Sequence, residues 1–325
     1  MDIVKPIKEI FKAYDIRGKF PDEINRDVAY TIGKAYGTKL LSIGKNKCIV
    51  GYDNRESSIE LSLSLSLGIL STGVDVINLG LVTTPMAIYS KEVLKIPSYV
   101  MVTASHNPKD DNGFKFSFDE SGNVKGDDID KFYDLVVSGN FKEGMGKFSR
   151  YNVEKDYLEL FRRGINLGDK KLKVVIDLAN GTTSCIAREL FEQFDIDLTI
   201  INEESDPSFP NHHPDPCVAA NQKQLQDKVL ELHADLGIGF DGDGDRCGIV
   251  DNLGHIIPTD IYMAIMCKDI ILNNEDKRIL YDVKCSNALK DEIVKWGGIP
   301  ICYRTGASYT MAKVIDDNIL FGGEY

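Results

Sequence analysis

The chain has 325 residues, of which 43% are hydrophobic and 27% are charged, so it can bury a sizeable core and is not a disordered polypeptide. At roughly 150 residues for each domain, the length alone suggests about two domains. Asp and Glu number 50 against 38 Lys and Arg, a formal net charge of −12. This balance argues against nucleic acid or an anionic membrane as the main partner, because both need a positive field. It leaves room for a local basic pocket that binds a phosphorylated small molecule.

The cysteines and the N-terminal segment are typical of a cytoplasmic protein. The seven cysteines are widely spaced and form no C-x-x-C pair, which favours reduced thiols over a disulfide framework or a zinc site. Residues 1–18 carry charges every few positions and lack the apolar core of a signal peptide. The sequence contains no run of 18 apolar residues, so it predicts no membrane-spanning helix, and we expect no membrane partner.

The first predicted unit of strand, helix and strand lies in the N-terminal third. Residues 47–51 form a short β-rich run that ends in Y-D-N-R at 52–55, and a second apolar run covers 74–79. Between them, leucines alternate with serines, which by a period of two alone is typical of a strand. The segment's length, its cap-like serines and its place in the unit favour a helix from about 57 to 71. We expect its apolar face to consist of Ile59, Leu63, Leu67 and Leu70.

The same order of elements recurs twice further along the chain. The predicted strand, helix and strand fall at 172–177, 183–193 and 197–201, and again at 278–283, 287–296 and 299–303. This is the βαβ unit, whose parallel strands need a helical crossover. Three copies predict three related α/β domains in tandem. Segments rich in glycine and charge place the boundaries near 151 and 254, which gives domains 1–150, 151–253 and 254–325.

A loop of small polar residues, T-A-S-H-N-P at 103–108, follows an apolar run. Its proline stops the preceding element, and its asparagine favours a turn. Ser105 is thereby expected on an exposed loop after a strand, where nucleophiles often lie, although an ordinary turn is an equal alternative. We expect no Ser–His pair with His106, because adjacent residues rarely face each other. The absence of G-x-S-x-G gives little support to acyl transfer.

Three carboxylates, Asp241, Asp243 and Asp245, alternate with glycines in D-G-D-G-D-R after a strand-like run. In a tight loop they repel one another unless a cation neutralises them, and hard carboxylate oxygens suit Mg²⁺. The glycines would let the backbone curl around the ion. An EF-hand is excluded, because Arg246 and Asn252 stand where that loop needs Gly and Glu. A solvated acidic turn is the remaining alternative.

Several basic residues follow strand-like or glycine-bearing segments. Arg17 precedes a glycine near the N-terminus, and Lys115 follows the serine loop closely in N-G-F-K. Lys284 ends the first strand of the third unit, at the edge where open α/β sheets bind ligands. A plain surface position is the commoner outcome for any single Lys or Arg, with Arg246 inside the acidic loop as the exception. The connector N-H-H-P-D-P at 211–216 favours a structural role over a metal site.

The combination of T-A-S-H-N-P, N-G-F-K, D-G-D-G-D-R and F-K-A-Y-D-I-R-G at 11–18 resembles the α-D-phosphohexomutases, of the phosphomannomutase/phosphoglucomutase kind. The resemblance covers residues 11–325. It implies α/β domains with mixed sheets flanked by helices, four of them around a central cleft. The chain would then contain the first three domains and lack the fourth, which binds the distal phosphate. It departs from the family pattern in T-G-A-S, where Ala307 replaces a histidine.

The resemblance also implies a role for each matching residue. Ser105 would carry the transferred phosphoryl group and would complete a Mg²⁺ site with Asp241, Asp243 and Asp245. Phosphate contact or proton transfer would fall to Lys115, Arg17 and Arg246. Contacts to the substrate would come from His106, Lys284, Thr305, Gly306 and Glu324.

The activity implied in this way is that of an isomerase of carbohydrate metabolism. It would move a phosphoryl group between O6 and O1 of mannose or glucose phosphate, through a phosphoserine and a hexose 1,6-bisphosphate. We expect a monomer or weak dimer. Two alternatives stay open. One is a haloacid-dehalogenase-like phosphatase with Asp241 as nucleophile, since D-G-D-G matches its D-x-D-G start; the other is an impaired fragment that only binds sugar phosphate.

Overall fold

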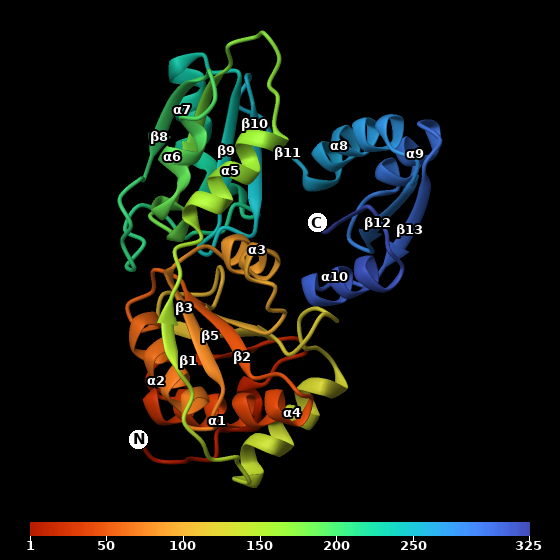
Figure 1. Cartoon of the computed structure of the whole chain (residues 1–325). Coiled ribbons are helices and arrows are strands. Elements are labelled where there is room, and N and C mark those ends of the chain that lie inside the picture. Colours follow the sequence, from red (N-terminus) through yellow and green to blue (C-terminus); the bar gives the residue numbers. More distant parts are fainter.

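The computed structural model describes residues 1–325, which form three lobes in chain order (Figure 1). Each lobe is built on its own sheet, of six, five and three strands, and we call the lobes domains I, II and III. The prediction of three tandem α/β domains is confirmed, with mixed sheets in domains I and II and a parallel sheet in domain III. The two domains suggested by length alone are too few. None of the helices is long and apolar enough to cross a membrane.

Domain I has a mixed sheet in the order β1-β5-β4-β2-β3-β6. The β2–β3, β2–β4 and β3–β6 pairs are parallel, while β5 runs antiparallel to both β1 and β4. The strands are β1 (Ile16–Lys19), β2 (Lys47–Tyr52), β3 (Asp75–Leu81), β4 (Tyr99–Val102), β5 (Asp111–Ser117) and β6 (Phe148–Arg150). The helices are η1 (Lys8–Ile10), α1 (Arg26–Ser42), α2 (Ser58–Leu70), α3 (Thr84–Leu94) and α4 (Asp127–Ser138).

Helix α2 confirms the helix predicted over 57–71, but the predicted apolar face is wrong. Ile59, Leu63 and Leu67 are about half exposed, at 55%, 50% and 50%, whereas Leu61 and Leu65 are fully buried against α1. The two helices cross so closely that a Cβ on Gly33 of α1 would lie 2.2 Å from the Leu65 carbonyl oxygen. Such a crossing selects small residues, so the serines of α2 face inward.

Domain II has the sheet order β11-β10-β9-β7-β8, parallel at β8–β7–β9 and antiparallel from β9 to β11. The strands are β7 (Lys173–Asp177), β8 (Asp197–Ile201), β9 (Leu236–Phe240), β10 (Cys247–Asp251) and β11 (Ile256–Ile257). The helices are α5 (Glu154–Gly164), η2 (Thr182–Cys185), α6 (Ala187–Phe191), η3 (Ala219–Gln222) and α7 (Lys223–Leu232).

The helix predicted over 183–193 is only partly formed, as the short elements η2 and α6. The start of this segment bonds to another loop, because the Thr182 backbone N–H donates to the Gly242 carbonyl at 2.9 Å. The Thr182 hydroxyl also accepts the Asn54 N–H of domain I at 3.1 Å. This segment therefore serves contacts at the carboxyl end of the sheet instead of continuing a regular helix.

Domain III has three parallel strands in the order β13-β12-β14, flanked by α8 (Thr259–Asn273), α9 (Asn287–Lys295) and α10 (Ala307–Asp316). The strands are β12 (Arg278–Asp282), β13 (Ile299–Tyr303) and β14 (Phe321–Gly323). Figure 1 shows α10 reaching down towards domain I. There the ring of Tyr309 meets Tyr14 edge-on, at 6.3 Å between centroids.

Candidate active site

Ser105 lies in the loop between β4 and β5, in a left-handed backbone conformation with φ of 55°. Its N–H donates to the Thr103 hydroxyl at 2.8 Å. Its own hydroxyl donates to Asp241 Oδ2 of domain II at 3.1 Å. The prediction of an exposed position is wrong for this residue, which is only 1% exposed, because the acidic loop of domain II covers it.

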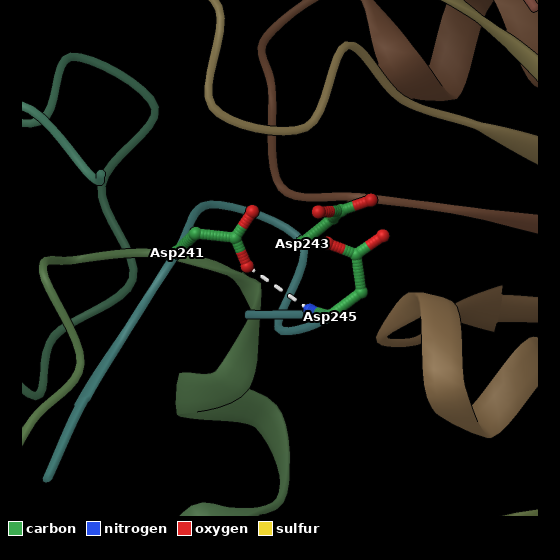
Figure 2. A group of neighbouring side chains, drawn as sticks. All are labelled: Asp241, Asp243 and Asp245. Atoms are coloured by element: carbon green, nitrogen blue, oxygen red, sulfur yellow. Dashed lines mark hydrogen bonds between the residues drawn. The ribbon is translucent and has the colours of Figure 1, made fainter. Parts of the chain in front are cut away.

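The acidic loop joins the antiparallel strands β9 and β10 and gathers the three predicted aspartates (Figure 2). One oxygen from each carboxylate lies within 4.8 Å of the others. Asp241 Oδ1 accepts the backbone N–H groups of Asp245 and Arg246, both at 3.0 Å, which folds the loop back on itself. Gly244 makes the turn with φ of 74°, a conformation that side chains beyond glycine rarely adopt. Asp241 and Asp243 are fully buried.

Lys115 of β5 supplies the charge that this loop needs. Its ammonium lies 2.6 Å from Asp243 Oδ2 and 2.7 Å from Asp245 Oδ2. Burial would lower the pKa of Lys115, but these two carboxylates raise it, so the ammonium stays charged. Burial would likewise raise the pKa of Asp243, yet Lys115 holds it well below its usual range. Asp241 has no such partner, and burial together with the charges of Asp243 and Asp245 raises its pKa well above the ordinary value.

The residues present fit a divalent cation. Asp243 Oδ1 is buried and accepts no hydrogen bond, which is costly for a carboxylate oxygen unless it faces a cation. The donor set consists of carboxylate oxygens, with the Ser105 hydroxyl beside them, and these hard ligands suit Mg²⁺. The loop therefore has the chemistry of a site for a divalent cation.

Arg17 of β1 and His106 lie on the domain I side of this cluster. Arg17 donates to the Asn107 side chain at 2.9 Å and pairs with Asp15 at 2.8 Å, so it contacts the serine loop. His106 Nδ1 lies 3.4 Å from Ser105 Oγ, against the expectation that these neighbours do not meet. The left-handed turn at Ser105 makes this contact possible. Burial, with the charges of Arg246 and Arg17, lowers the pKa of His106 to about 4, so its imidazole is neutral at pH 7.

The residues predicted to contact substrate in domain III form a second cluster, around Asp282. This carboxylate is 1% exposed and ends β12. Its Oδ2 accepts the Thr305 hydroxyl at 2.8 Å and lies 3.8 Å from the Lys284 ammonium. Glu324 accepts the Gly306 backbone N–H, and burial raises the pKa of its carboxyl group. Loops that follow β12, β13 and β14 are thus joined at one edge of the sheet.

Sequence reasoning missed three residues that hold the two clusters. Thr84 donates its hydroxyl to Asp243 Oδ2 at 2.6 Å and its N–H to the Asp243 carbonyl at 2.9 Å. Arg55 binds the serine loop, and Asp282 joins the loops of domain III. The available signal was a charged or hydroxyl residue at the end of a predicted strand or a few residues beyond it, where α/β sheets carry their sites.

Fold and site together define a multidomain α/β protein in which a serine of one domain faces an acidic loop of the next. Comparison with known families agrees. Residues 8–143, 155–254 and 258–325 match domains I, II and III of phosphoglucomutase/phosphomannomutase, each described as alpha/beta/alpha. The chain belongs to the phosphoglucomutase/phosphomannomutase family.

Individual relatives are similar over nearly the whole chain. The phosphomannomutase/phosphoglucomutase of Pseudomonas aeruginosa is 38% identical over 315 residues, which are 97% of this chain and 68% of that protein. The phosphoglucomutase of Neisseria meningitidis is 33% identical, over 98% of this chain and 69% of its own length. A crystal structure of a family member from Burkholderia thailandensis superposes with a TM-score of 0.94 at 34% identity, covering 98% of this chain and 71% of that one. The chain spans about two thirds of the length of these relatives.

Proposed function

We propose that this chain carries the phosphoserine and metal centre of a phosphohexomutase, which interconverts the 6-phosphate and 1-phosphate of a hexose. The observation that carries the proposal is the contact of Ser105 Oγ with Asp241 at 3.1 Å, beside the ammonium of Lys115. A nucleophilic hydroxyl, carboxylate metal ligands and a fixed cation are the parts that phosphoryl transfer needs. Family membership supports the same activity.

The reaction would proceed in two balanced transfers. In the first, the Ser105 Oγ–P bond breaks and a P–O bond forms to the free hydroxyl of the hexose phosphate, whose proton passes to a base. The serine oxygen takes up a proton as it leaves, which gives a hexose 1,6-bisphosphate and a free serine hydroxyl. The bisphosphate then reorients. In the second transfer the P–O bond of its other phosphate to the sugar breaks and the sugar oxygen takes up a proton, while the Ser105 hydroxyl loses its proton to a base and the Oγ–P bond forms again. Mannose and glucose phosphates are the proposed substrates.

The chain's own residues would supply positioning and charge. Asp241, Asp243 and Asp245, with an oxygen of phosphorylated Ser105, would hold Mg²⁺, which when bound polarises the phosphoryl group. Lys115, Arg17 and Arg246 would balance the negative charge of the moving group. Neutral His106 lies close enough to the serine to contact a sugar hydroxyl.

Around Asp282, substrate contacts would come from Lys284, Thr305, Gly306 and Glu324. The lysine and the glutamate suit phosphate and sugar hydroxyls respectively. A cytoplasmic location and a monomeric or weakly dimeric state stay predictions.

The phosphatase alternative has less support. Both oxygens of Asp241 already accept hydrogen bonds, Oδ1 from two backbone N–H groups and Oδ2 from Ser105, and the carboxylate is fully buried. A carboxylate nucleophile needs a free oxygen that faces the phosphoryl group. Nothing in the phosphatase reading accounts for the serine that lies beside it.

Incubation with glucose 1,6-bisphosphate and Mg²⁺ tests the proposal. We expect mass spectrometry to find about 80 Da added to the Ser105 peptide, as one phosphoryl group. Ser105→Ala is the control and should take up no label. A label that hydroxylamine removes would instead indicate an acyl phosphate on aspartate. A native chain that takes no phosphate on Ser105 would contradict the mutase mechanism, and turnover of hexose 1-phosphate separates an enzyme from a fragment that only binds.

A further inference from the structure

Arg55 is a buried arginine whose two terminal nitrogens both face the loop that carries Ser105. It follows β2 and is 2% exposed. One terminal nitrogen donates to the Ser105 and Asn107 carbonyls at 2.8 and 2.7 Å. The other donates to the Pro108 and Asp111 carbonyls at 2.6 and 2.9 Å. Four carbonyl groups of the segment 105–111 therefore converge on one guanidinium group.

The charge of Arg55 is compensated within domain I and covered by domain II. Its Nε lies 3.2 Å from Asp53 Oδ2, and that carboxylate also accepts the Arg55 N–H and the Ser58 hydroxyl. The ring of Phe209 from domain II lies 5.8 Å from the guanidinium carbon. Arg55 has no exposed face, so it is not a surface cation available to a substrate.

The loop conformation needs this support. Ser105 is a non-glycine residue with φ of 55°, a strained conformation that persists only where the surroundings fix it. Arg55 holds its carbonyl oxygen, and the Thr103 hydroxyl holds its N–H. Both peptide groups next to Ser105 are thus fixed, and bonds from a charged donor are the stronger kind.

We propose that Arg55 is a positioning residue for the phosphoserine loop, holding Ser105 in the left-handed conformation that directs its hydroxyl at Asp241. The inference rests on the proposed phosphoserine chemistry at Ser105. Arg55 touches neither the serine side chain nor any predicted substrate contact, and it acts through the backbone. The planar fork matters more than the charge, because an ammonium group cannot reach four carbonyls spread along seven residues.

Hydrogen–deuterium exchange of Arg55→Lys tests the positioning directly and needs no substrate. The amides of Ser105, Asn107 and Asp111 bond within the loop, so we expect them to exchange at least about tenfold faster in the variant. The exchange of peptides from the sheet of domain II should be unchanged, which would show that the variant is folded. Arg26→Lys, an exposed arginine at the start of α1, is the matched control. Unchanged exchange of the loop amides in Arg55→Lys would overturn the inference.

Single-turnover phosphorylation by glucose 1,6-bisphosphate supplies the second measurement. Since Arg55 orients the serine without touching the sugar, we expect the maximal rate in Arg55→Lys to fall by about tenfold to a hundredfold. The half-saturating concentration of the bisphosphate should stay within about twofold. An arginine with a purely structural role would lower the thermal midpoint without this split between rate and saturation.

The outcomes separate the two proposals. If the native chain and Arg26→Lys take phosphate at Ser105 and Arg55→Lys does so equally fast, the role of Arg55 is refuted and the mutase function stands. If the native chain takes no phosphate, the proposed function fails, and the exchange measurement alone decides whether Arg55 holds the loop.

Discussion

At the scale of single residues, Lys115 lies between two carboxylates that would otherwise repel each other inside a buried loop. Its bonds to Asp243 and Asp245 explain how three aspartates can occupy one turn before any ion arrives. The arrangement is uneven, because Asp243 Oδ1 keeps no partner and Asp241 has its pKa raised. A cation would contribute most at these two carboxylates, because it would face the unpartnered oxygen of Asp243 and would offset the repulsion that acts on Asp241.

Asp243→Asn should weaken Mg²⁺ binding by at least about tenfold, since it removes the negative charge of a ligand whose carboxylate has an unpartnered oxygen. Titration calorimetry with MgCl₂ measures the change. Asp195→Asn is the control, because Asp195 is exposed and pairs only with Lys171. Equal affinity in Asp243→Asn and the native chain would contradict the metal site.

The sequence carried enough information to bring together the residues that bear the chemistry, but not those that hold them in place. Ser105 and the three aspartates lie in unusual local patterns. For the aspartates the residue type favours a cation, whereas for Ser105 an ordinary turn was an equal alternative until the family resemblance was considered. Arg55 and Asp282 look like any charged residue near the end of a strand. They hold the site through carbonyl and hydroxyl groups that are distant in sequence. No local sequence pattern shows that these distant groups come together around Arg55 and Asp282.

At the scale of elements, α2 shows that a helix can be predicted correctly while its buried face is predicted wrongly. A heptad-like apolar stripe normally marks the buried side, but here the close crossing with α1 buries a stripe of serine, glycine and leucine instead. The buried face of α2 is therefore determined by α1. The sequence of α2 alone does not show that α1 carries the glycines that allow the close crossing.

Matched leucine truncations in α2 test this assignment. Leu65→Ala should lower the free energy of unfolding by about 2–5 kcal/mol, because it leaves a cavity between α1 and α2. Leu63→Ala, half exposed on the opposite face, should cost less than about 1 kcal/mol. Urea denaturation measures both. Equal losses would contradict the observed orientation of the helix.

The connector that contains His212 is tied to β7 by a pair that titrates. His212 Nε2 lies 2.9 Å from Asp177 Oδ2, and the Gly242 N–H of the acidic loop donates to the neighbouring Pro214 carbonyl at 3.2 Å. Burial would lower the pKa of His212, but Asp177 and the His213 carbonyl outweigh it and raise the pKa above its ordinary value. The predicted structural role of this connector is consistent with these bonds.

A histidine whose pKa is raised on folding stabilises the protein fully below the unfolded pKa of about 6.5, and the stabilisation is lost as pH rises through the folded pKa. The loss of stability in His212→Gln should therefore be larger at about pH 5.5 than at about pH 8.5. Thermal unfolding at both values measures the difference. His213→Gln, an exposed neighbour, is the control. A loss of stability in His212→Gln that is larger at about pH 8.5 than at about pH 5.5 would contradict the pairing of His212 with Asp177.

At the scale of the whole molecule, the repeated unit of strand, helix and strand predicted the number and class of the domains. It could not predict how the domains sit against one another (Figure 1). That arrangement rests in part on polar bonds at strand ends, such as Thr84 to Asp243 and Asn54 to the Asn180 carbonyl at 2.8 Å. It also rests on an apolar cluster that the two domains share, in which Met86 of domain I lies with Ile186 and Leu190 of domain II. The polar bonds have no periodicity, and the hydrophobic period of an element does not tell which of its apolar side chains face another domain.

The placement of the serine and the carboxylates on different domains has a thermodynamic consequence. Any small molecule or ion that needs both groups binds only the docked arrangement of domains I and II, so its binding and the docking are linked. A ligand present at a hundred times its dissociation constant adds about 2.7 kcal/mol to the arrangement that it binds. The free energy that holds domains I and II together therefore depends on the concentration of such a ligand, and is not fixed by the fold alone.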